Sequence, residues 1–335
     1  MTEPRRIFRR PPTAQAGLAA PVTIGLAAPV TITADPASAG SRLDRWLHAQ
    51  LPELSRARLQ ALIEAGNVRV NGAVRKASHR LAGGARVEVE IPPPPPETLE
   101  PEPIALAIVH EDEDVLVVDK PAGMVVHPGA GHARGTLASA VLAHAPSTAG
   151  VGGPRRPGVV HRLDKGTSGL LAIAKTPRAY ESLVAQLAAR TVTRRYVAIV
   201  CGRVRLAEGV IDAPIGRHPR DRVRMAVQPA GRGRRAVTRY RVLERFSQVT
   251  YVELRLETGR THQIRVHLAL LGHPVLGDDV YGGRGRVRLP VPIEGLALHA
   301  RMLGFLHPVT QKRMEFTSPV PPRIERVLSH LRTSG

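Results

Sequence analysis

Cysteine is nearly absent from this chain of 335 residues, in which Cys201 is the only one. A single thiol cannot form an intrachain disulfide and cannot supply a thiolate cluster for zinc. The histidines show no metal motif either, because His262 and His267 lie off the i, i+4 spacing that lets two residues of a helix bind one ion. We therefore expect no metal and no cofactor-binding cysteine, and a reducing compartment, the cytoplasm.

Aromatic residues and long apolar runs are also scarce. Phe, Trp and Tyr make up 3% of the chain, which argues against a surface that stacks successive unpaired bases. No segment approaches the roughly 18 continuous apolar residues that cross a membrane, so we expect no membrane partner. Positive charge, in contrast, is abundant, with 48 Lys and Arg against 28 Asp and Glu. This excess points to nucleic acid held by phosphate contacts and shape, although an arginine-rich genome would produce the same composition.

The first forty residues differ in composition from the rest. They are rich in Pro and Ala and contain one octapeptide twice, at Gly17–Ile24 and Gly25–Ile32. Because a proline interrupts each copy, we predict a disordered tail over residues 1–40. The pair Arg5-Arg6 imitates an export signal, but the apolar stretch that follows is weak and broken by proline. A second proline-rich stretch, Pro92–Pro103, predicts an extended acidic linker between two folded domains.

Residues 41–91 have the pattern of a small α+β domain. Apolar residues at helical spacing follow Ser41, and Ser55 is expected to cap a second helix. Asn71-Gly72 between alternating valines predicts a hairpin. The unit resembles the RNA-binding domain of the S-four type, first recognised in a ribosomal protein of the small subunit. That resemblance implies phosphate contacts by Arg42, Arg56, Arg58 and Arg69. Alternatively, these arginines only form the solvated faces of two short helices.

Residues 104–335 combine strands and helices in loose alternation. Buried strands are predicted at 115–118, 196–200, 236–243 and 249–256. Thr176 is expected to cap a helix that begins at Pro177, and Thr261 another helix. This order favours an α+β domain with a mixed, largely antiparallel sheet and flanking helices.

The stretch His161-Arg162-Leu163-Asp164-Lys165-Gly166-Thr167-Ser168-Gly169 surrounds one carboxylate with cations and turn-forming residues. Nearby positive charge favours the ionised form of Asp164, which makes it a candidate nucleophile or base. The simpler interpretation is that Asp164 and Thr167 only shape a turn through local hydrogen bonds.

These residues resemble the signature of the pseudouridine synthases that act on large-subunit ribosomal RNA, the RluA and RluD family. Three further blocks follow in the family's order, beginning at Arg194, Gly259 and Leu271. The resemblance covers residues 104–319. It implies the family's fold and the isomerisation of uridine to pseudouridine without a cofactor.

The resemblance also implies roles for individual residues. Asp164 would be catalytic, either as a covalent nucleophile or by removing a ribose proton. Arg265 would hold Asp164 as a bidentate partner, and Tyr196 would stack on the flipped uracil. Arg162 would occupy the space that the flipped base leaves. Without the resemblance, Tyr196 would be taken for a core residue and Arg265 for the surface of a helix.

The substrate is expected from finer similarities. The segments 215–219 and 225–227 look closest to the RluD branch, whose substrate is the helix 69 stem-loop of 23S ribosomal RNA. Nine arginines between Arg217 and Arg241 would form a second phosphate-binding surface or, in the simpler view, a solvated face. We expect a monomer that acts on 23S ribosomal RNA or on the assembling large subunit. Other hypotheses are another ribosomal site or a transfer RNA, and a noncatalytic ribosome-assembly factor.

Overall fold

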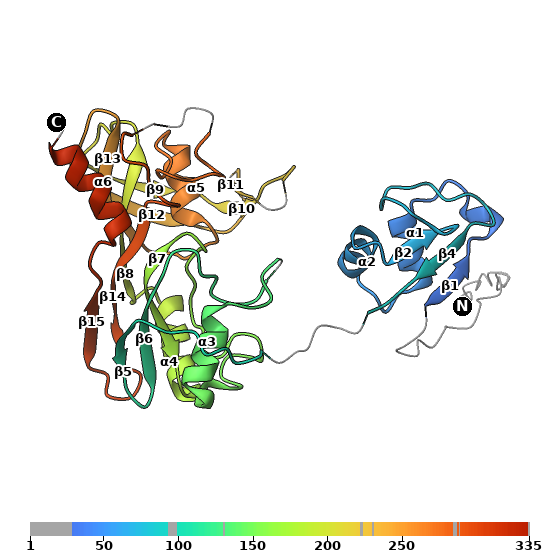
Figure 1. The fold of residues 1–335 in the computed structure, drawn as a ribbon, viewed down its shortest axis with the longest axis horizontal. Coiled ribbons are helices and arrows are strands. Elements are labelled where there is room, and N and C mark those ends of the chain that lie inside the picture. Colours follow the sequence, from blue (N-terminus) through green and yellow to red (C-terminus); the bar gives the residue numbers. More distant parts are fainter. Residues whose placement is uncertain are drawn as a thin grey trace, which may run out of the picture. The chain divides into compact units, whose positions relative to one another are not determined.

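The computed structural model describes residues 29–92, 99–129, 131–221, 224–229, 231–283, 287 and 289–333. The chain divides into two compact units, residues 1–95 and 96–335 (Figure 1). Each unit has its own hydrophobic core. Within these ranges no helix combines the length and the apolar character needed to span a membrane. Residues 1–28 of the predicted tail and 93–98 of the predicted linker lie outside the described part.

The first unit is a four-stranded antiparallel sheet, in the order β1-β4-β2-β3, with two helices. Its elements are β1 (Val30–Thr33), a 3-10 helix (Pro36–Ser38), α1 (Leu43–Gln50), α2 (Arg56–Glu64), β2 (Val68–Val70), β3 (Ala73–Val74) and β4 (Arg86–Val89). The Ser55 side chain accepts a hydrogen bond from the Arg58 N–H and so caps α2. Asn71 and Gly72 have φ values of 50° and 77°, the left-handed pair that a tight hairpin requires. The predicted helices and hairpin are confirmed.

The prediction of a disordered tail up to residue 40 is wrong for its last part. Val30–Thr33 forms β1 and pairs along its length with β4. The reason is the alternation of Val and Thr, which turns Ile32 toward the core of the unit while the threonines remain exposed. The second copy of the octapeptide therefore ends inside the folded unit.

The predicted linker is also too long at its C-terminal end. Leu99 packs against the core of the second unit, and its N–H donates to the Pro154 carbonyl. The Glu102 carboxylate accepts the Gly135 N–H at 3.0 Å. Proline-rich chain can thus lie on a domain surface wherever a side chain finds a partner there.

The second unit is built on a nine-stranded sheet of order β5-β6-β7-β14-β8-β13-β12-β9, with β15 paired to β14. Its strands are β5 (Ile108–Glu111), β6 (Val115–Lys120), β7 (Ser168–Ala174), β8 (Thr193–Cys201), β9 (Glu208–Asp212), β12 (Val237–Arg245), β13 (Val249–Leu256), β14 (Leu298–Leu306) and β15 (Arg313–Thr317), and a separate hairpin holds β10 (Ile215–Arg217) and β11 (Met225–Val227). Only β7 and β14 pair in parallel among the described strands. The predicted mixed, largely antiparallel sheet is confirmed.

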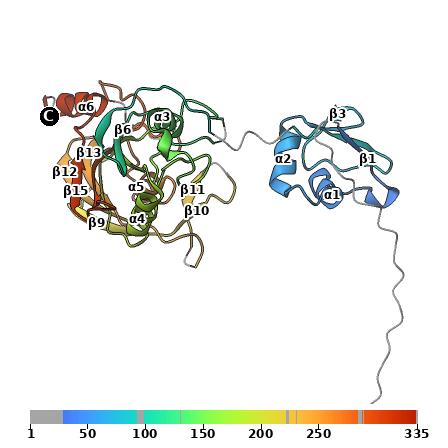
Figure 2. The same ribbon diagram turned by 90° about the horizontal axis from the view of Figure 1, so that it is seen from below.

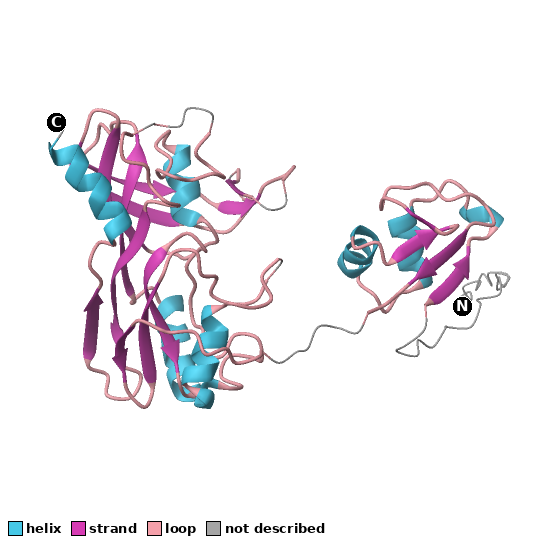
Figure 3. Ribbon diagram, in the orientation of Figure 1, coloured by secondary structure: helices cyan, strands magenta, loops and turns pink. Residues whose placement is uncertain are grey.

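Helices flank this sheet, as Figures 2 and 3 show. They are α3 (Leu137–His144), α4 (Pro177–Ala188), α5 (Gln263–Leu270) and α6 (Pro322–Thr333). Thr176 caps α4 as predicted, through the Ala179 N–H. Thr261 does not cap α5, because the helix begins one residue later, after His262 in a left-handed conformation with φ 55°. The Gln263 side chain instead accepts the Arg260 N–H at 2.9 Å.

Candidate active site

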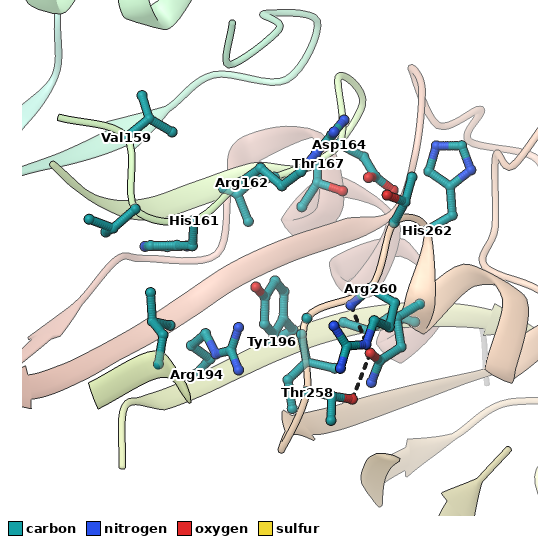
Figure 4. A pocket seen from close by; sticks show the side chains of 18 of the residues that line it. Val159, His161, Arg162, Asp164, Thr167, Arg194, Tyr196, Thr258, Arg260 and His262 are labelled. Carbon is teal, nitrogen blue, oxygen red and sulfur yellow. Dashed lines mark hydrogen bonds between the residues drawn. The ribbon is translucent and has the colours of Figure 1, made fainter. Parts of the chain in front are cut away.

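A cavity of about 660 Å³ opens in the second unit, where the loop before β7, strand β8 and the start of α5 come together (Figure 4). Its size falls within the range of pockets that bind small molecules. Among the described residues that line it, Asp164 is the only acidic one, against six arginines: Arg156, Arg162, Arg190, Arg194, Arg234 and Arg260. The cavity is therefore suited to an anionic or oxygen-rich ligand.

Asp164 lies in a tight turn at the entrance to β7. The turn is closed by the backbone, since the Thr167 N–H donates to the Asp164 carbonyl at 3.0 Å. Two residues later Gly169 crosses β14 so closely that a Cβ there would lie 2.3 Å from the Ala300 carbonyl oxygen. The Asp164 carboxylate takes no part in the turn and receives its hydrogen bond from Arg265. The simpler interpretation, in which Asp164 only shapes the turn, does not describe this geometry.

Arg265 joins two carboxylates. Its Nη1 donates to Asp164 Oδ2 at 3.2 Å, while Nε and Nη2 donate to Asp278 at 2.7 and 2.9 Å. The expected contact between Arg265 and Asp164 is present, but the bidentate partner is Asp278 and not Asp164. The Nε and Nη2 groups of Arg265 face Asp278 because the Val280 and Tyr281 N–H groups hold that carboxylate in place. Burial alone would raise the pKa of Asp278, but the guanidinium outweighs burial and lowers that pKa.

Lys120 contacts the loop that carries Asp164, and the sequence analysis did not name it as a site residue. Its side chain is fully buried at the end of β6. Its Nζ donates to the carbonyls of Pro121 and Met124 at 2.8 Å, and more weakly to that of Lys165 at 3.4 Å. Burial lowers the pKa of Lys120 to about 7, although the negative charge of Asp164 acts in the opposite direction.

Tyr196 and Arg194 lie two residues apart on β8 and both line the cavity. Residues at this spacing share one face of a strand, and both side chains are buried, at 5% and 7% exposure. Burial raises the pKa of the Tyr196 hydroxyl, the charge of Arg194 lowers that pKa, and the charge of Asp164 raises it. The structure thus brings Tyr196 to the same cavity as Asp164, while stacking on a uracil stays a prediction. It also adds Arg194, which the sequence analysis named only as the start of a motif.

Arg162 and His262 lie on the Asp164 side of the cavity, as Figure 4 shows. Arg162 is exposed to solvent and lines the cavity. His262 Nδ1 lies 2.9 Å from the Tyr281 hydroxyl. Burial lowers the pKa of His262, which therefore stays neutral near pH 7 despite the nearby Asp164 carboxylate. The sequence analysis considered His262 only as a possible metal ligand and did not predict that it lines the cavity.

The four arginines predicted to bind phosphate lie in the first unit. Arg42 makes two hydrogen bonds to the buried Asp44, and Arg56 lies 3.7 Å from the same carboxylate. Arg58 donates to the Pro92 carbonyl at 3.2 Å. Arg69 is exposed on β2. The sequence analysis did not predict the ion pair between Arg42 and Asp44 within the first unit.

The arginine-rich segment between Arg217 and Arg241 has no single role. Arg239 and Arg241 pair with Glu257 and Glu253 across β12 and β13. Arg234, on the turn before β12, lines the cavity. Within the described ranges no group of three or more His, Cys, Asp or Glu side chains could hold a metal ion.

The chain is similar to known proteins over most of its length. The model of the RNA pseudouridylate synthase family matches residues 114–270, and that of the S4 domain matches residues 41–87. A ribosomal large subunit pseudouridine synthase D of Pseudomonas aeruginosa is 48% identical over 303 residues, which cover 88% of this chain and 92% of that protein. An RNA pseudouridine synthase of Bacillus subtilis is 46% identical over 91% of this chain and 98% of its own length.

Solved structures show the same likeness. Human RNA pseudouridylate synthase domain containing 1 matches 68% of this chain and 95% of its own, with 28% identity and a TM-score of 0.53. The chain belongs to the RNA pseudouridine synthase family and carries an S4 domain before its catalytic domain. It is an RNA pseudouridine synthase, an isomerase of uridine.

Proposed function

We propose that this enzyme converts uridine to pseudouridine in 23S ribosomal RNA, with Asp164 as its catalytic carboxylate. The observation that carries the proposal is that the described lining of the cavity holds one carboxylate, Asp164, and six arginines, and that Arg265 donates to this carboxylate at 3.2 Å. The relatives named ribosomal large subunit pseudouridine synthase D support ribosomal RNA as the substrate.

The reaction detaches uracil from its ribose, turns it and rejoins it through carbon five, without redox chemistry. Asp164 either forms a covalent bond with the nucleotide or takes a proton from the ribose. Both routes need an oriented carboxylate, and the hydrogen bond from Arg265 Nη1 holds Asp164 Oδ2 in place. The base must leave its stack to reach Asp164, and Arg162 at the mouth of the cavity would fill the vacancy. Tyr196, buried beside Asp164, would then pack against the extruded uracil.

Replacing Asp164 by Asn tests this assignment. The substrate is 23S ribosomal RNA transcribed without modification and tritiated at carbon five of uridine, so that isomerisation releases tritium. We expect release by the parent and a loss of at least about a thousandfold in the variant, with RNA affinity nearly unchanged. Appreciable turnover by Asp164→Asn would refute the role of this carboxylate. Silence of both proteins on free RNA and on assembling subunits would favour the noncatalytic assembly factor.

Within 23S ribosomal RNA, we propose the helix 69 stem-loop as the target, on the similarity to the RluD branch. Sequencing of modified sites in RNA treated with the enzyme distinguishes this stem-loop from another ribosomal site and from a transfer RNA. We further propose that the enzyme acts as a monomer in the cytoplasm, where the large subunit assembles.

The first unit is proposed to bind the RNA backbone. Arg56, Arg58 and Arg69 are the better candidates for phosphate contacts, because Arg42 already donates two hydrogen bonds to Asp44, through Nε and Nη2. Replacing Arg69 by Gln in the full chain should lower the slope of log affinity against log salt by about one. An unchanged slope would remove Arg69 from the RNA contact.

A further inference from the structure

Arg194 is a buried cation without an anionic partner. Its side chain is 7% exposed, and its Nε is buried without a hydrogen-bond partner. Within the described part of the chain, no carboxylate forms an ion pair with it. An unpaired charge away from water is costly, so proteins rarely keep one unless a ligand completes it. Arg194 lines the cavity, and such a ligand can reach it there.

The surroundings of Arg194 keep its charge unopposed and leave it room. His161 accepts the Ala172 N–H through Nε2, which leaves the hydrogen on Nδ1, and this atom is also buried without a partner. Burial and, to a smaller extent, the charge of Arg194 together lower the pKa of His161 to about 3, so the imidazole stays neutral. Gly259 provides the space, because a Cβ at this position would lie 2.7 Å from Arg194 Nη1.

The depth of Arg194 indicates which part of a nucleotide it meets. Four other arginines of the cavity, Arg156, Arg162, Arg190 and Arg234, are exposed at its mouth. A phosphate of a continuous strand is tied to nucleotides on both sides and stays at the mouth, where these arginines can bind it. An extruded base is attached to the strand only through its ribose, so it can enter the interior of the cavity. Arg194 shares a strand face with Tyr196, so a base packed on that ring would present its edge to the guanidinium (Figure 4).

We propose that Arg194 binds a carbonyl oxygen of the extruded uracil and stabilises the uracil anion that forms when the glycosidic bond breaks. This inference rests on the proposed function. The bond between C1′ and N1 breaks with its electron pair on N1, and the charge spreads over N1 and the two carbonyl oxygens. After rotation, C5 forms the new bond to C1′ and loses its proton, while N1 gains one. A preorganised cation facing a developing anion stabilises it more than it stabilises the neutral base.

Replacing Arg194 by Met tests the proposal through rate and stability together. We expect the single-turnover rate of isomerisation in 23S ribosomal RNA to fall about a hundredfold, the usual effect of losing one such donor. RNA affinity should stay within about threefold. The unfolding temperature should hold or rise, because the variant no longer buries an unpaired charge. Arg194→Lys, which keeps the charge without the fork, should recover part of the rate.

Two further variants separate this role from simple packing. Arg195 lies next to Arg194 on the opposite face of β8 and does not line the cavity, so Arg195→Met is the matched control and should keep the parental rate within about twofold. Gly259→Ala keeps the Arg194 charge but displaces its tip, since the contact falls on the end of a flexible side chain. It should reduce the rate in the same direction as Arg194→Met.

The leaving group gives the decisive measurement. A fluorine at C5 stabilises the uracil anion, so RNA with 5-fluorouridine at the target depends less on Arg194. We expect the loss caused by Arg194→Met to be at least about tenfold smaller on this substrate, measured as disappearance of 5-fluorouridine from nuclease digests. Equal losses on both substrates together with a lower unfolding temperature would refute the proposal. So would weaker RNA binding at an unchanged rate, the result expected of a phosphate contact. A parent that does not isomerise uridine refutes the proposed function itself, whereas an active parent with an equally active Arg194→Met refutes this inference alone.

Discussion

Replacing Asp278 by Asn removes one charge from the chain Asp278–Arg265–Asp164 while keeping the size of the side chain. Asp278 is 4% exposed and accepts four hydrogen bonds, two from Arg265 and one each from the Val280 and Tyr281 N–H groups. Asn has one acceptor oxygen and one donor nitrogen. If its oxygen stays with the two backbone N–H groups and Arg265 Nη2, its nitrogen faces Arg265 Nε at the present 2.7 Å, donor against donor.

The cost of this change follows from the contacts. Arg265 loses one charge-assisted hydrogen bond, worth about 1.5–3 kcal/mol, and keeps a buried N–H without a partner. Removing one partner of a buried ion pair costs about 3–5 kcal/mol, and Asn retains part of the bonding. We therefore expect a loss of about 2–4 kcal/mol. Part of it will appear in the rate, because Arg265 will turn away from Asp164, and about 1.4–2.7 kcal/mol in the barrier corresponds to a 10- to 100-fold slower reaction.

Tritium release under single-turnover conditions measures the rate, and urea denaturation measures the free energy of unfolding. Asp279→Asn is the matched control, since it removes an equal charge from the adjacent, exposed position. We expect Asp279→Asn to stay within about threefold of the parent. RNA affinity should change little in Asp278→Asn, because Asp278 does not line the cavity.

A double-mutant cycle states what would refute the reasoning. Asp278 acts only through Arg265, so the rate defect of Asp278→Asn combined with Arg265→Lys should be clearly smaller than the product of the two single defects. Independent, multiplicative effects would mean that Asp278 influences catalysis by another route. If Asp278→Asn keeps the parental rate and the parental free energy of unfolding, the two hydrogen bonds between Arg265 and Asp278 contribute to neither quantity.

Three further predictions concern other parts of the fold. Asp44→Asn should destabilise the first unit by about 2 kcal/mol, and the fluorescence of Trp46, the only tryptophan of the chain, measures its unfolding. In the parent, a hydrogen bond from Arg42 lowers the pKa of Asp44 to about 2. The stabilisation by this carboxylate should therefore be lost as the pH falls from about 4 to 2. Burial lowers the pKa of Lys120 to about 7 in the folded chain, so between pH 7 and 10 the unfolded chain binds more protons than the folded one. Over this range the free energy of unfolding of the parent should rise by about 4 kcal/mol relative to that of Lys120→Met. The same pH dependence of the urea midpoint in both proteins would contradict this. Gly169→Ala should lower the free energy of unfolding by about 3 kcal/mol or more, because φ is +116° and the new Cβ would collide with the Ala300 carbonyl; an unchanged melting temperature would show that the strands can move apart.

Local rules were sufficient wherever a residue's role depends on its neighbours in the sequence. Ser55 and Thr176 cap their helices, and Asn71-Gly72 forms its hairpin, because caps and tight turns use groups three or four residues apart. The same rules failed at Val30–Thr33, where the proline-rich composition concealed a strand that becomes stable only when β4 lies beside it.

Pairs that join distant segments could not be derived from local patterns. Asp164 and Arg265 are brought together across 101 positions, and only the family resemblance connected them. That resemblance did not reveal how Arg265 divides its donors. A guanidinium has five N–H groups in a fixed plane, so two carboxylates can share it, and which of them receives two bonds depends on the backbone around each. Asp278 has that backbone support and Asp164 does not.

Arg194 shows a signal that was present in the sequence and could have been used. Arg194 and Tyr196 are separated by two positions in a segment expected to be a strand, which places them on the same face. If Tyr196 faces the reacting base, Arg194 must face it too, and Arg195 must face away. An arginine on a buried face with no acidic residue opposite it is unfavourable for folding. Its presence there is best explained by a substrate oxygen that completes its hydrogen bonds.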